Sequence, residues 1–309
     1  MSSALVARTE CPVCQGKDFE PIHKEPYTSE GLQAYLKHHY QGRADLPAEG
    51  LQYRLVRCRG CSFSFQLDVP GAELLARIYD HWIPELAREA VQASHSLHDY
   101  RYLAEQVQFV IQHFGLAPHQ LKLHDFGFGW AEWARMAAAF GCQVSGSELS
   151  SVRMAHAKAL GLKLIDSSAL PPSSFHFINT EQVFEHVLEP LPLLRTLSNA
   201  LLPRGLIKVS VPDAKRAIAK LRASGSLGSL KAADMMPLAP LEHINAFEYA
   251  SLVRLGTQAG LRVKRPSFFK LYNAGSGWLE ARQAARMLLR PWFRHQYPRS
   301  TFIYFERSH

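Results

Sequence analysis

The segment from Leu121 to Ala134 constrains the fold more than any other part of the sequence. A short apolar run ends in Asp125, and Gly127 and Gly129 follow before a helical pattern begins. Two glycines allow a tight turn and a close approach of the backbone to a ligand. In doubly wound α/β folds, such a turn at the carboxyl end of the first strand binds nucleotides. The segment therefore predicts a parallel sheet with a nucleotide or nucleoside site.

Short apolar runs alternate with longer amphipathic stretches after Pro118, which is the pattern of βα units around a parallel sheet. We expect strands at residues 121–126, 143–148, 163–165, 175–179, 205–211, 261–265 and 301–306. The expected helices cover residues 131–140, 152–160, 190–201 and 246–260. These elements predict an α/β fold with a Rossmann-like, doubly wound sheet of seven strands and helices on both faces.

The first 80 residues differ from the rest, because they hold four of the five cysteines and few periodic segments. Residues 72–114 then show a helical pattern. We predict three parts: an N-terminal zinc-binding module at 1–80, a helical linker region at 81–117, and the main domain at 118–309. Within the main domain, residues 213–242 are expected to form a less regular lid, and residues 268–298 a C-terminal insertion.

Four cysteines form two Cys-x-x-Cys pairs, Cys11 with Cys14 and Cys58 with Cys61. In a reducing compartment such pairs favour a metal over disulfides. Two pairs complete a tetrahedral zinc site with no open ligand position, so the zinc would be structural. This pattern predicts a small module resembling a zinc ribbon.

The spacing of the two pairs is wider than in common zinc ribbons. Cys14 and Cys58 are separated by 43 residues, so an insertion with a helix near residues 32–38 has to loop out. Gln15 and Ser62 stand at positions where metal-binding loops often have glycine.

Composition and charge exclude some classes of protein. With 309 residues, of which 47% are hydrophobic, the chain can bury a large core. No apolar run approaches the ~18 residues that span a bilayer, and residues 4–7 are too short for the apolar region of a signal peptide. We therefore expect a cytoplasmic protein without membrane contact. The net charge of +8 suggests an anionic partner, which could be a phosphorylated substrate, a carrier protein or nucleic acid.

An acidic residue after the second expected strand narrows the choice of ligand. Glu148 lies 23 residues after Asp125, where a carboxylate can accept hydrogen bonds from both hydroxyls of a ribose. A dinucleotide fingerprint would need a third glycine at position 132, where this chain has Glu132. The spacing therefore favours a bound nucleoside and weakens the case for an oxidoreductase.

Three segments resemble class I S-adenosylmethionine-dependent methyltransferases. The pattern Asp-x-Gly-x-Gly-x-Ala from Asp125 to Ala131 resembles their motif I, with alanine at the usual third glycine. Residues 174–212 and 241–247 resemble the fourth-strand region and a downstream histidine segment of the methyltransferase-23-like family. The cysteine module resembles the front part of many members. His176 departs from the usual aspartate, and Arg204 from the first glycine of a turn.

The resemblance implies S-adenosylmethionine as the cofactor. Its amino acid head would be held by Asp125, the glycine turn and the fourth strand, and its ribose by Glu148. Leu149 and two serines after the third strand would flank the adenine. The implied cofactor-binding residues are Asp125, Phe126, Gly127, Gly129, Glu148, Leu149, Ser167, Ser168, Asn179, Thr180 and Glu181.

Catalysis by such an enzyme needs an aligned acceptor and, for some acceptors, a base. The resemblance makes His186 and His243 the candidate bases, with Glu185 beside them. In related enzymes a Glu-x-x-Glu-His motif and a later histidine bind a divalent metal. Here Gln182 replaces the first carboxylate and removes a charge that a hard cation prefers, which disfavours a catalytic metal. The alternative is structural: Glu185 and His186 could simply hydrogen-bond the helix that follows.

Three functions remain open at this point. The leading hypothesis is methyl transfer to oxygen, nitrogen or carbon of a small, anionic molecule in a biosynthetic or surface-polysaccharide pathway. The second is an RNA or tRNA methyltransferase, because arginines recur every four residues near the C-terminus; a solvated helix face is the simpler explanation of that spacing. The third is a noncatalytic protein that only binds S-adenosylmethionine. The arginines are Arg282, Arg286, Arg290 and Arg294.

Overall fold

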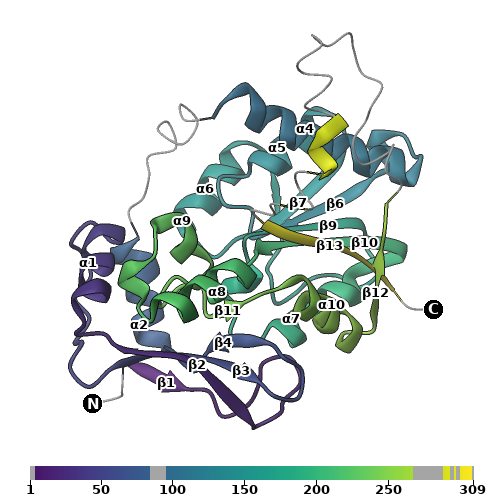
Figure 1. Ribbon diagram of the computed structural model, residues 1–309. Coiled ribbons are helices and arrows are strands. Elements are labelled where there is room, and N and C mark those ends of the chain that lie inside the picture. Colours follow the sequence, from purple (N-terminus) through teal and green to yellow (C-terminus); the bar gives the residue numbers. More distant parts are fainter. Residues whose placement is uncertain (1–3, 84–94, 267–287, 293–295, 297–299, 308–309) are drawn as a thin grey trace. The chain divides into compact units, whose positions relative to one another are not determined.

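The computed structural model describes the chain except for residues 1–3, 84–94, 267–287, 293–295, 297–299 and 308–309 (Figure 1). The chain divides into two compact units. Residues 1–86, 184–192 and 211–258 form one, here called the N-terminal unit. Residues 87–183, 193–210 and 259–309 form the other, the Rossmann-like unit. The segment expected as a lid, 213–242, belongs to the N-terminal unit.

A seven-stranded sheet forms the centre of the Rossmann-like unit, which confirms the predicted fold class. Its strands are ordered β12-β13-β10-β9-β6-β7-β8. The five strands from β10 to β8 run parallel, whereas β12 and β13 pair antiparallel. The bounds are β6 Lys122–Phe126, β7 Gln143–Ser147, β8 Lys163–Leu164, β9 Phe175–Glu181, β10 Leu201–Pro212, β12 Leu261–Lys264 and β13 Ser300–Arg307.

The strand order creates a switch point between β6 and β9. From β6 the chain moves outward through β7 to β8, and then returns to place β9 on the other side of β6. In doubly wound sheets, ligands bind at the carboxyl ends of the strands at such a switch point. Asp125 and Asn179 lie at this point and are register partners.

Helices cover both faces of this sheet. Figure 1 shows α4 and α5 on one side of the sheet and α7 on the other. The packing of α4 and α5 buries Val110, Trp133, Leu123 and Phe177 in one cluster. The helix α4 begins with a capping box between Ser96 and Asp99 and ends at Gly115. The bounds are α4 Leu97–Phe114, η2 Pro118–Gln120, α5 Glu132–Ala139, α6 Ser151–Ala159 and α7 Pro190–Ala200.

The N-terminal unit contains more strand than its sequence pattern indicated. A four-stranded antiparallel sheet has the order β11-β4-β3-β2, and β1 pairs with β5. Its strands are β1 Leu5–Ala7, β2 Phe19–Pro26, β3 Gln52–Cys58, β4 Ser64–Gln66, β5 Asp68–Pro70 and β11 Asn245–Ala246. Its helical segments are α1 Glu30–His39, α2 Ala72–Arg77, η1 Ile78–Trp82, η3 Phe184–His186, α8 Lys215–Ser224, η4 Leu227–Ser229, α9 Ala232–Met235, η5 Met236–Leu238 and α10 Tyr249–Gln258.

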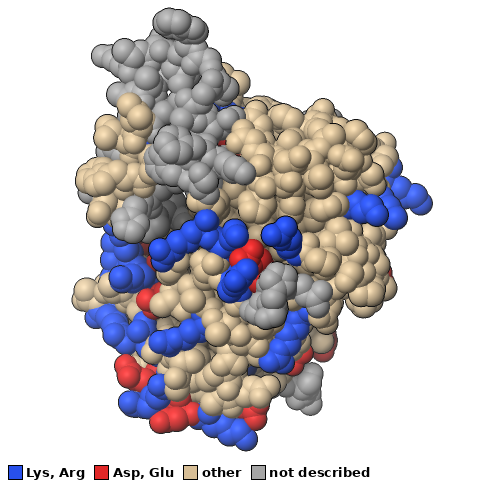
Figure 2. Space-filling model, turned by 90° about the vertical axis from the view of Figure 1, so that its right-hand side faces the viewer, with Lys and Arg blue, Asp and Glu red and all other residues tan. Residues whose placement is uncertain are grey.

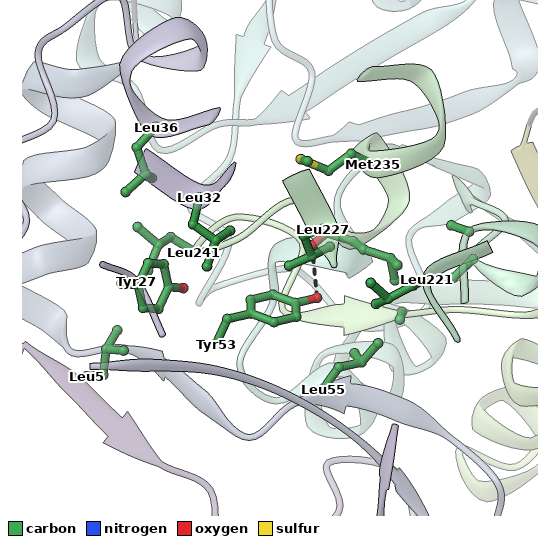
Figure 3. Close-up of a cluster of buried hydrophobic side chains, with 14 of the residues drawn as sticks. Leu5, Tyr27, Leu32, Leu36, Tyr53, Leu55, Leu221, Leu227, Met235 and Leu241 are labelled. Carbon is green, nitrogen blue, oxygen red and sulfur yellow. Dashed lines mark hydrogen bonds between the residues drawn. The ribbon is translucent and has the colours of Figure 1, made fainter. Parts of the chain in front are cut away.

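One apolar core holds this unit together, and it joins segments far apart in the sequence. Figure 3 shows Leu32 of α1, Tyr53 and Leu55 of β3 and Leu221 of α8 in the cluster. The hydroxyl of Tyr53 donates to the backbone carbonyl of Leu238 at 3.1 Å, which satisfies a buried polar group.

The expectation of a less regular lid was wrong for residues 215–224, which form the helix α8. Its buried side chains are Ala217, Ile218 and Leu221. The spacing of Ala217 and Leu221 places these two residues on one helical face. The lysines and arginines between them had masked this short apolar stripe.

Two further expectations concern the periphery of the chain. Among the described residues, no helix combines the length and the apolar character needed to cross a bilayer. Most of the expected insertion at 268–298 lies outside the described residues, as do Arg282, Arg286 and Arg294. Arg290 is described, and its guanidinium donates to the Glu105 carboxylate at 2.6 Å.

Candidate functional site

Asp125 and Asn179 form the centre of a polar site at the carboxyl edge of the sheet. Asp125 is the fourth residue of β6 and Asn179 the fifth of β9, and both are almost completely buried. The amide Nδ2 of Asn179 donates to Oδ1 of Asp125 at 2.8 Å. Burial raises the pKa of the Asp125 carboxyl to about 7, and the hydrogen bond from Asn179 only partly opposes this effect.

The other polar atom of Asn179 is available for a ligand. Its buried Oδ1 has no hydrogen-bond partner in the described part of the chain. A buried amide oxygen without a partner is costly, so it indicates an acceptor awaiting a donor. The ammonium group of an amino acid ligand would supply such a donor.

The glycine turn follows Asp125 directly and needs its glycines for shape. Gly127 has a φ of +71°, and a Cβ there would lie 2.6 Å from Cγ2 of Val183. Its amide donates to the carbonyl of Ser147 at 2.8 Å, which fixes the turn against β7. Ala131, at the position of the usual third glycine, also has a positive φ of 61°. Its left-handed backbone is therefore strained, because a side chain disfavours that conformation.

Glu148 connects the glycine turn to the start of α6. Its Oε2 accepts from the amide of Gly129 at 2.9 Å, and its Oε1 accepts from the amides of Leu149 at 2.8 Å and Ser150 at 3.1 Å. The carboxylate is thereby oriented, and its oxygens retain lone pairs that can accept ribose hydroxyls. Glu148 therefore lies directly beside the glycine turn.

The residues expected around an adenine differ in what they can contribute. Leu149 is 85% exposed, as expected for an apolar side chain that lies against a flat ligand. Both the amide and the hydroxyl of Ser168 donate to the Asp166 carboxylate, at 2.8 and 2.7 Å. Asp166, which the sequence reasoning missed, is therefore the stronger acceptor at this loop. Ser167 lies in the same loop, between β8 and β9.

The other end of the site contains a buried lysine that the sequence reasoning also missed. Lys208 of β10 is 1% exposed, and its ammonium donates to Glu181 and, at 2.5 Å, to Oε1 of Gln106. Burial lowers the pKa of Lys208, but the effects of Glu181, Tyr102 and Asp125 together outweigh burial, so the pKa is raised. Ser210 donates to Glu181 at 2.9 Å, and the Thr180 hydroxyl donates to the Lys208 carbonyl. A lysine within an apolar strand was the signal that could have revealed this network.

These side chains fit S-adenosylmethionine, whose parts need different partners. Acceptors for its ammonium and sulfonium are present at Asp125 and Asn179, and an oriented carboxylate for its ribose at Glu148. No atom lies within 4 Å of a Cβ built on Gly129, which leaves the open space that a close ligand needs. Phe126 and Thr180 are register partners within the strands and shape the floor of the site.

The four paired cysteines come together in the N-terminal unit. Their sulfurs all lie within 4.8 Å of one another, and the distances Cys11–Cys61 and Cys14–Cys58 are both 3.5 Å. A tetrahedral zinc with bonds of about 2.3 Å would place its sulfurs about 3.8 Å apart. A hydrogen bond between the Cys11 and Cys61 sulfurs lowers the pKa of Cys11 to about 5.

The two cysteine loops have the same backbone geometry. The amide of Gln15 donates to the Cys11 carbonyl at 2.9 Å, and the amide of Ser62 donates to the Cys58 carbonyl at 2.8 Å. Gln15 and Ser62 have φ values of 61° and 59°, the conformation for which such loops use glycine. Two matching loops with converging sulfurs fit a structural zinc ion.

Glu185, His186 and His243 form a second cluster in the N-terminal unit. One ligand atom from each lies within 4.8 Å of the others, and the two imidazole rings are 4.7 Å apart at 78°. His186 Nδ1 lies 3.0 Å from the Glu242 carbonyl, and because a carbonyl only accepts, Nδ1 carries the proton. The lone pair of His186 is therefore on Nε2.

Both histidines are held in the neutral form. Burial lowers the pKa of His186, and burial together with the adjacent His186 lowers the pKa of His243 to about 3. The ring of His243 is hydrogen-bonded to the Met236 backbone, and its buried Nδ1 has no partner in the described chain. The cluster thus offers nitrogen lone pairs beside the Glu185 carboxyl, which suits a base or a divalent cation.

The chain is similar to known methyltransferases in sequence and in fold. A sequence model of the methyltransferase-23 family, described as a methyltransferase domain, matches residues 75–265. No curated protein sequence matches the chain. The crystal structure of the plantazolicin methyltransferase BamL, with a triazolic desmethylPZN analog and SAH, is similar at 13% identity, with a TM-score of 0.52 over 76% of this chain and 94% of BamL.

A second solved structure, an S-adenosylmethionine-dependent methyltransferase from Mesorhizobium loti, is 16% identical, with a TM-score of 0.44 over 66% of this chain and 98% of that protein. The likeness to BamL shows the fold, and the family model covers well over half of the sequence. The chain therefore belongs to the methyltransferase-23 family of S-adenosylmethionine-dependent methyltransferases.

Proposed function

We propose that this methyltransferase transfers the methyl group of S-adenosylmethionine to an oxygen, nitrogen or carbon atom of a small, anionic acceptor. The observation that carries the proposal is the polar edge of the sheet, where Asn179 holds Asp125 and Glu148 holds Gly129. The bound cofactor supplies a methyl carbon activated by an adjacent positive sulfur. The implied cofactor-binding residues, from Asp125 to Glu181, would bind and orient it.

The protein's own chemical step would be removal of a proton from the acceptor. His186 and His243 are neutral and have lone pairs that can accept a proton, although a pKa of about 3 makes His243 a weak base.

An anionic acceptor is favoured by the charge of the protein. Lys and Arg number 35 against 27 Asp and Glu. On the face shown in Figure 2, blue Lys and Arg side chains cover more of the surface than red Asp and Glu side chains. A positive surface raises the local concentration of anions and speeds their association. A phosphorylated or carboxylated small molecule is the class of acceptor that this surface suits.

The four-cysteine cluster is proposed to hold a structural zinc ion. All four ligand positions would be filled by sulfur, so no position remains for a substrate or an activated water. A zinc–thiolate site of this type also implies a reducing compartment, as in the cytoplasm.

Calorimetry and a transfer assay test the proposal. Wild-type protein should bind S-adenosylmethionine, and Asp125→Ala should weaken binding at least about tenfold, since removing one buried charged partner costs more than 1.4 kcal/mol. His186→Ala and His243→Ala should retain binding and lose about 10²–10⁴-fold in methyl transfer. Failure of the wild-type protein to bind the cofactor would refute the proposed function.

The acceptor class is tested with methyl-labelled cofactor and two pools, small anionic metabolites and RNA. Label should enter the metabolite pool. Transfer to RNA, with binding that weakens steeply as salt is raised, would instead support a nucleic-acid methyltransferase. A parallel assay after removal of divalent cations separates base catalysis by the histidines from metal assistance.

A further inference from the structure

The segments that carry the Glu185–His186–His243 cluster are held by a buried amide from the strand next to the cysteines. Gln66, the last residue of β4, is 1% exposed. Its Nε2 donates to the carbonyls of Ala239 at 2.9 Å and His243 at 3.1 Å, and its Oε1 accepts from the amide of Leu241 at 3.4 Å. One side chain thus fixes three backbone groups of the segment that ends at His243.

Asn245 holds the other segment in the same manner. It is also 1% exposed, and its Nδ2 donates to the carbonyls of Phe184 at 2.9 Å and Val187 at 2.6 Å. These two residues bracket Glu185 and His186. The amide is itself oriented, because its Oδ1 accepts from the guanidinium of Arg8 at 3.0 Å.

Backbone pairing connects both amides to the second cysteine loop. Asn245 pairs with Phe65 in the β4–β11 ladder, and the amide of Gln66 donates to the Ile244 carbonyl at 2.9 Å. The β4 strand begins three residues after Cys61, and the amide of Cys58 donates to the Phe63 carbonyl at 2.8 Å. The conformation of the loop between these cysteines therefore sets where β4 starts.

We propose that Gln66 and Asn245 are positioning residues for the Glu185–His186–His243 cluster, and that a metal ion in the four-cysteine site stabilises the cluster through β4. The inference rests on the proposed function for the chemical role of the histidines, but its geometry does not depend on that role. The cysteine module would then be a part of the active-site architecture. Loss of the metal should increase local unfolding of the segments 184–187 and 239–246 before it affects the Rossmann-like unit.

Hydrogen exchange measured by mass spectrometry tests the coupling on the full chain. Removal of metal from the zinc-loaded protein with a chelator should speed exchange of peptides covering 184–187 and 239–246 by roughly fivefold or more, the effect of one lost buried hydrogen bond. Peptides covering 122–126 and 175–181 should keep their protection and report that the Rossmann-like unit remains folded. An increase confined to 8–20 and 52–63 would overturn the coupling.

Variants of the two amides test positioning with the metal in place. Asn245→Asp keeps an acceptor for Arg8 but loses both donors, and Gln66→Glu keeps the acceptor for Leu241 but loses its donors. Gln66→Met and Asn245→Leu repeat the test without a buried charge. Each should speed exchange at 184–187 or 239–246 and lower kcat about tenfold or more, while the affinity for S-adenosylmethionine stays within about twofold.

Gln33→Glu is the control for loss of an amide donor, since the exposed Gln33 donates to the Tyr27 carbonyl at 2.7 Å outside this path. It should change neither exchange at the two segments nor kcat. Equal effects of Gln33→Glu and Asn245→Asp would overturn the positioning role. If the protein bound no S-adenosylmethionine, the proposed function would fail, and the exchange measurement would still decide the coupling.

Discussion

Asn179 Nδ2 donates a hydrogen bond to Asp125 Oδ1 across the β6–β9 pair at 2.8 Å. The bond fixes the orientation of the carboxyl but does not stabilise its charge enough to offset burial, so the pKa of Asp125 is raised to about 7. A cationic ligand would reverse this balance, because positive charge beside the carboxyl favours its ionised form. The site is thus poised to bind a cation such as a sulfonium.

The raised pKa of Asp125 predicts a specific dependence of stability on pH. Between the unfolded pKa of about 4 and the folded pKa of about 7, the folded state binds more protons than the unfolded state. The free energy of unfolding therefore falls as pH rises through this window, by up to roughly 1.4 kcal/mol per pH unit. Asp125→Asn should remove this contribution, as measured by urea unfolding from pH 4 to 8.

Buried histidines also make the stability depend on pH, so the contribution of Asp125 is measured as the difference in free energy of unfolding between wild type and Asp125→Asn. Burial lowers the pKa of His124 to about 4 and that of His243 to about 3, so their contributions to stability rise with pH up to about 6.5. Both contributions are present in wild type and in Asp125→Asn. If the difference in free energy of unfolding between the two proteins stays constant from pH 4 to 7, the raised pKa of Asp125 is contradicted.

The ion pair of Lys208 and Glu181 predicts a large cost for removing the carboxylate. The Lys208 side chain is 2% exposed and the Glu181 side chain 36%, so Glu181→Gln leaves a buried ammonium without its charged partner and should lower the free energy of unfolding by about 3–5 kcal/mol. Adding Lys208→Met to Glu181→Gln should recover much of this loss, because no unpaired charge remains. Lys220→Met, which breaks a more exposed pair with Asp234, should cost less than about 1 kcal/mol in the same urea titration.

Much of the fold was predictable because its signals are local in the sequence. Alternating apolar runs and glycine turns specify strands and helices within a few residues, so all seven expected strands of the sheet are present close to their expected bounds. The N-terminal strands were harder to predict. The segment β2 carries His23, Lys24 and Glu25 among its eight residues, and its burial depends on distant helices such as α8.

The candidate site likewise contains residues that the sequence predicted and residues that only the structure revealed. Asp125 and Glu148 were identified from spacing, because strand ends and turns define their positions. Lys208 and Asp166 were missed, since their roles arise from pairing with Glu181 and from a loop around Ser168. Gln66 and Asn245 carry no motif at all. The hydrogen bonds that their side chains donate join residues 58 to 177 positions apart in the sequence, which only the folded chain brings together.

The cysteine cluster predicts about one zinc ion per chain, measured by inductively coupled plasma mass spectrometry. Cys58→Ser should lose this zinc and lower the Tm markedly, because zinc binding to a folded site contributes directly to folding. Cys142→Ser is the control, since Cys142 is buried but lies outside the cluster. Full zinc content in Cys58→Ser would show that this residue is not a ligand.

Gly127 is predicted to tolerate no side chain. Gly127→Ala places a Cβ about 2.6 Å from Cγ2 of Val183 in a backbone conformation with a φ of +71°, and should cost about 1–3 kcal/mol. It should also weaken S-adenosylmethionine binding, because the turn shifts away from β7. Gly161→Ala separates strain from collision: its φ is +77° with no atom within 4 Å, so only the backbone cost of about 1 kcal/mol applies.

The collision itself can be relieved in a double variant. Val183→Ala removes the methyl groups that Gly127→Ala would meet, so the combined variant should recover the part of the loss that exceeds the Gly161→Ala control. The free energy of unfolding, measured in urea, and the affinity for S-adenosylmethionine, measured by calorimetry, should recover together, because the same displacement of the turn lowers both. If Gly127→Ala and Gly161→Ala lower the free energy of unfolding equally, the turn accommodates the new methyl group without further loss of stability, and Val183 does not fix the shape of the turn.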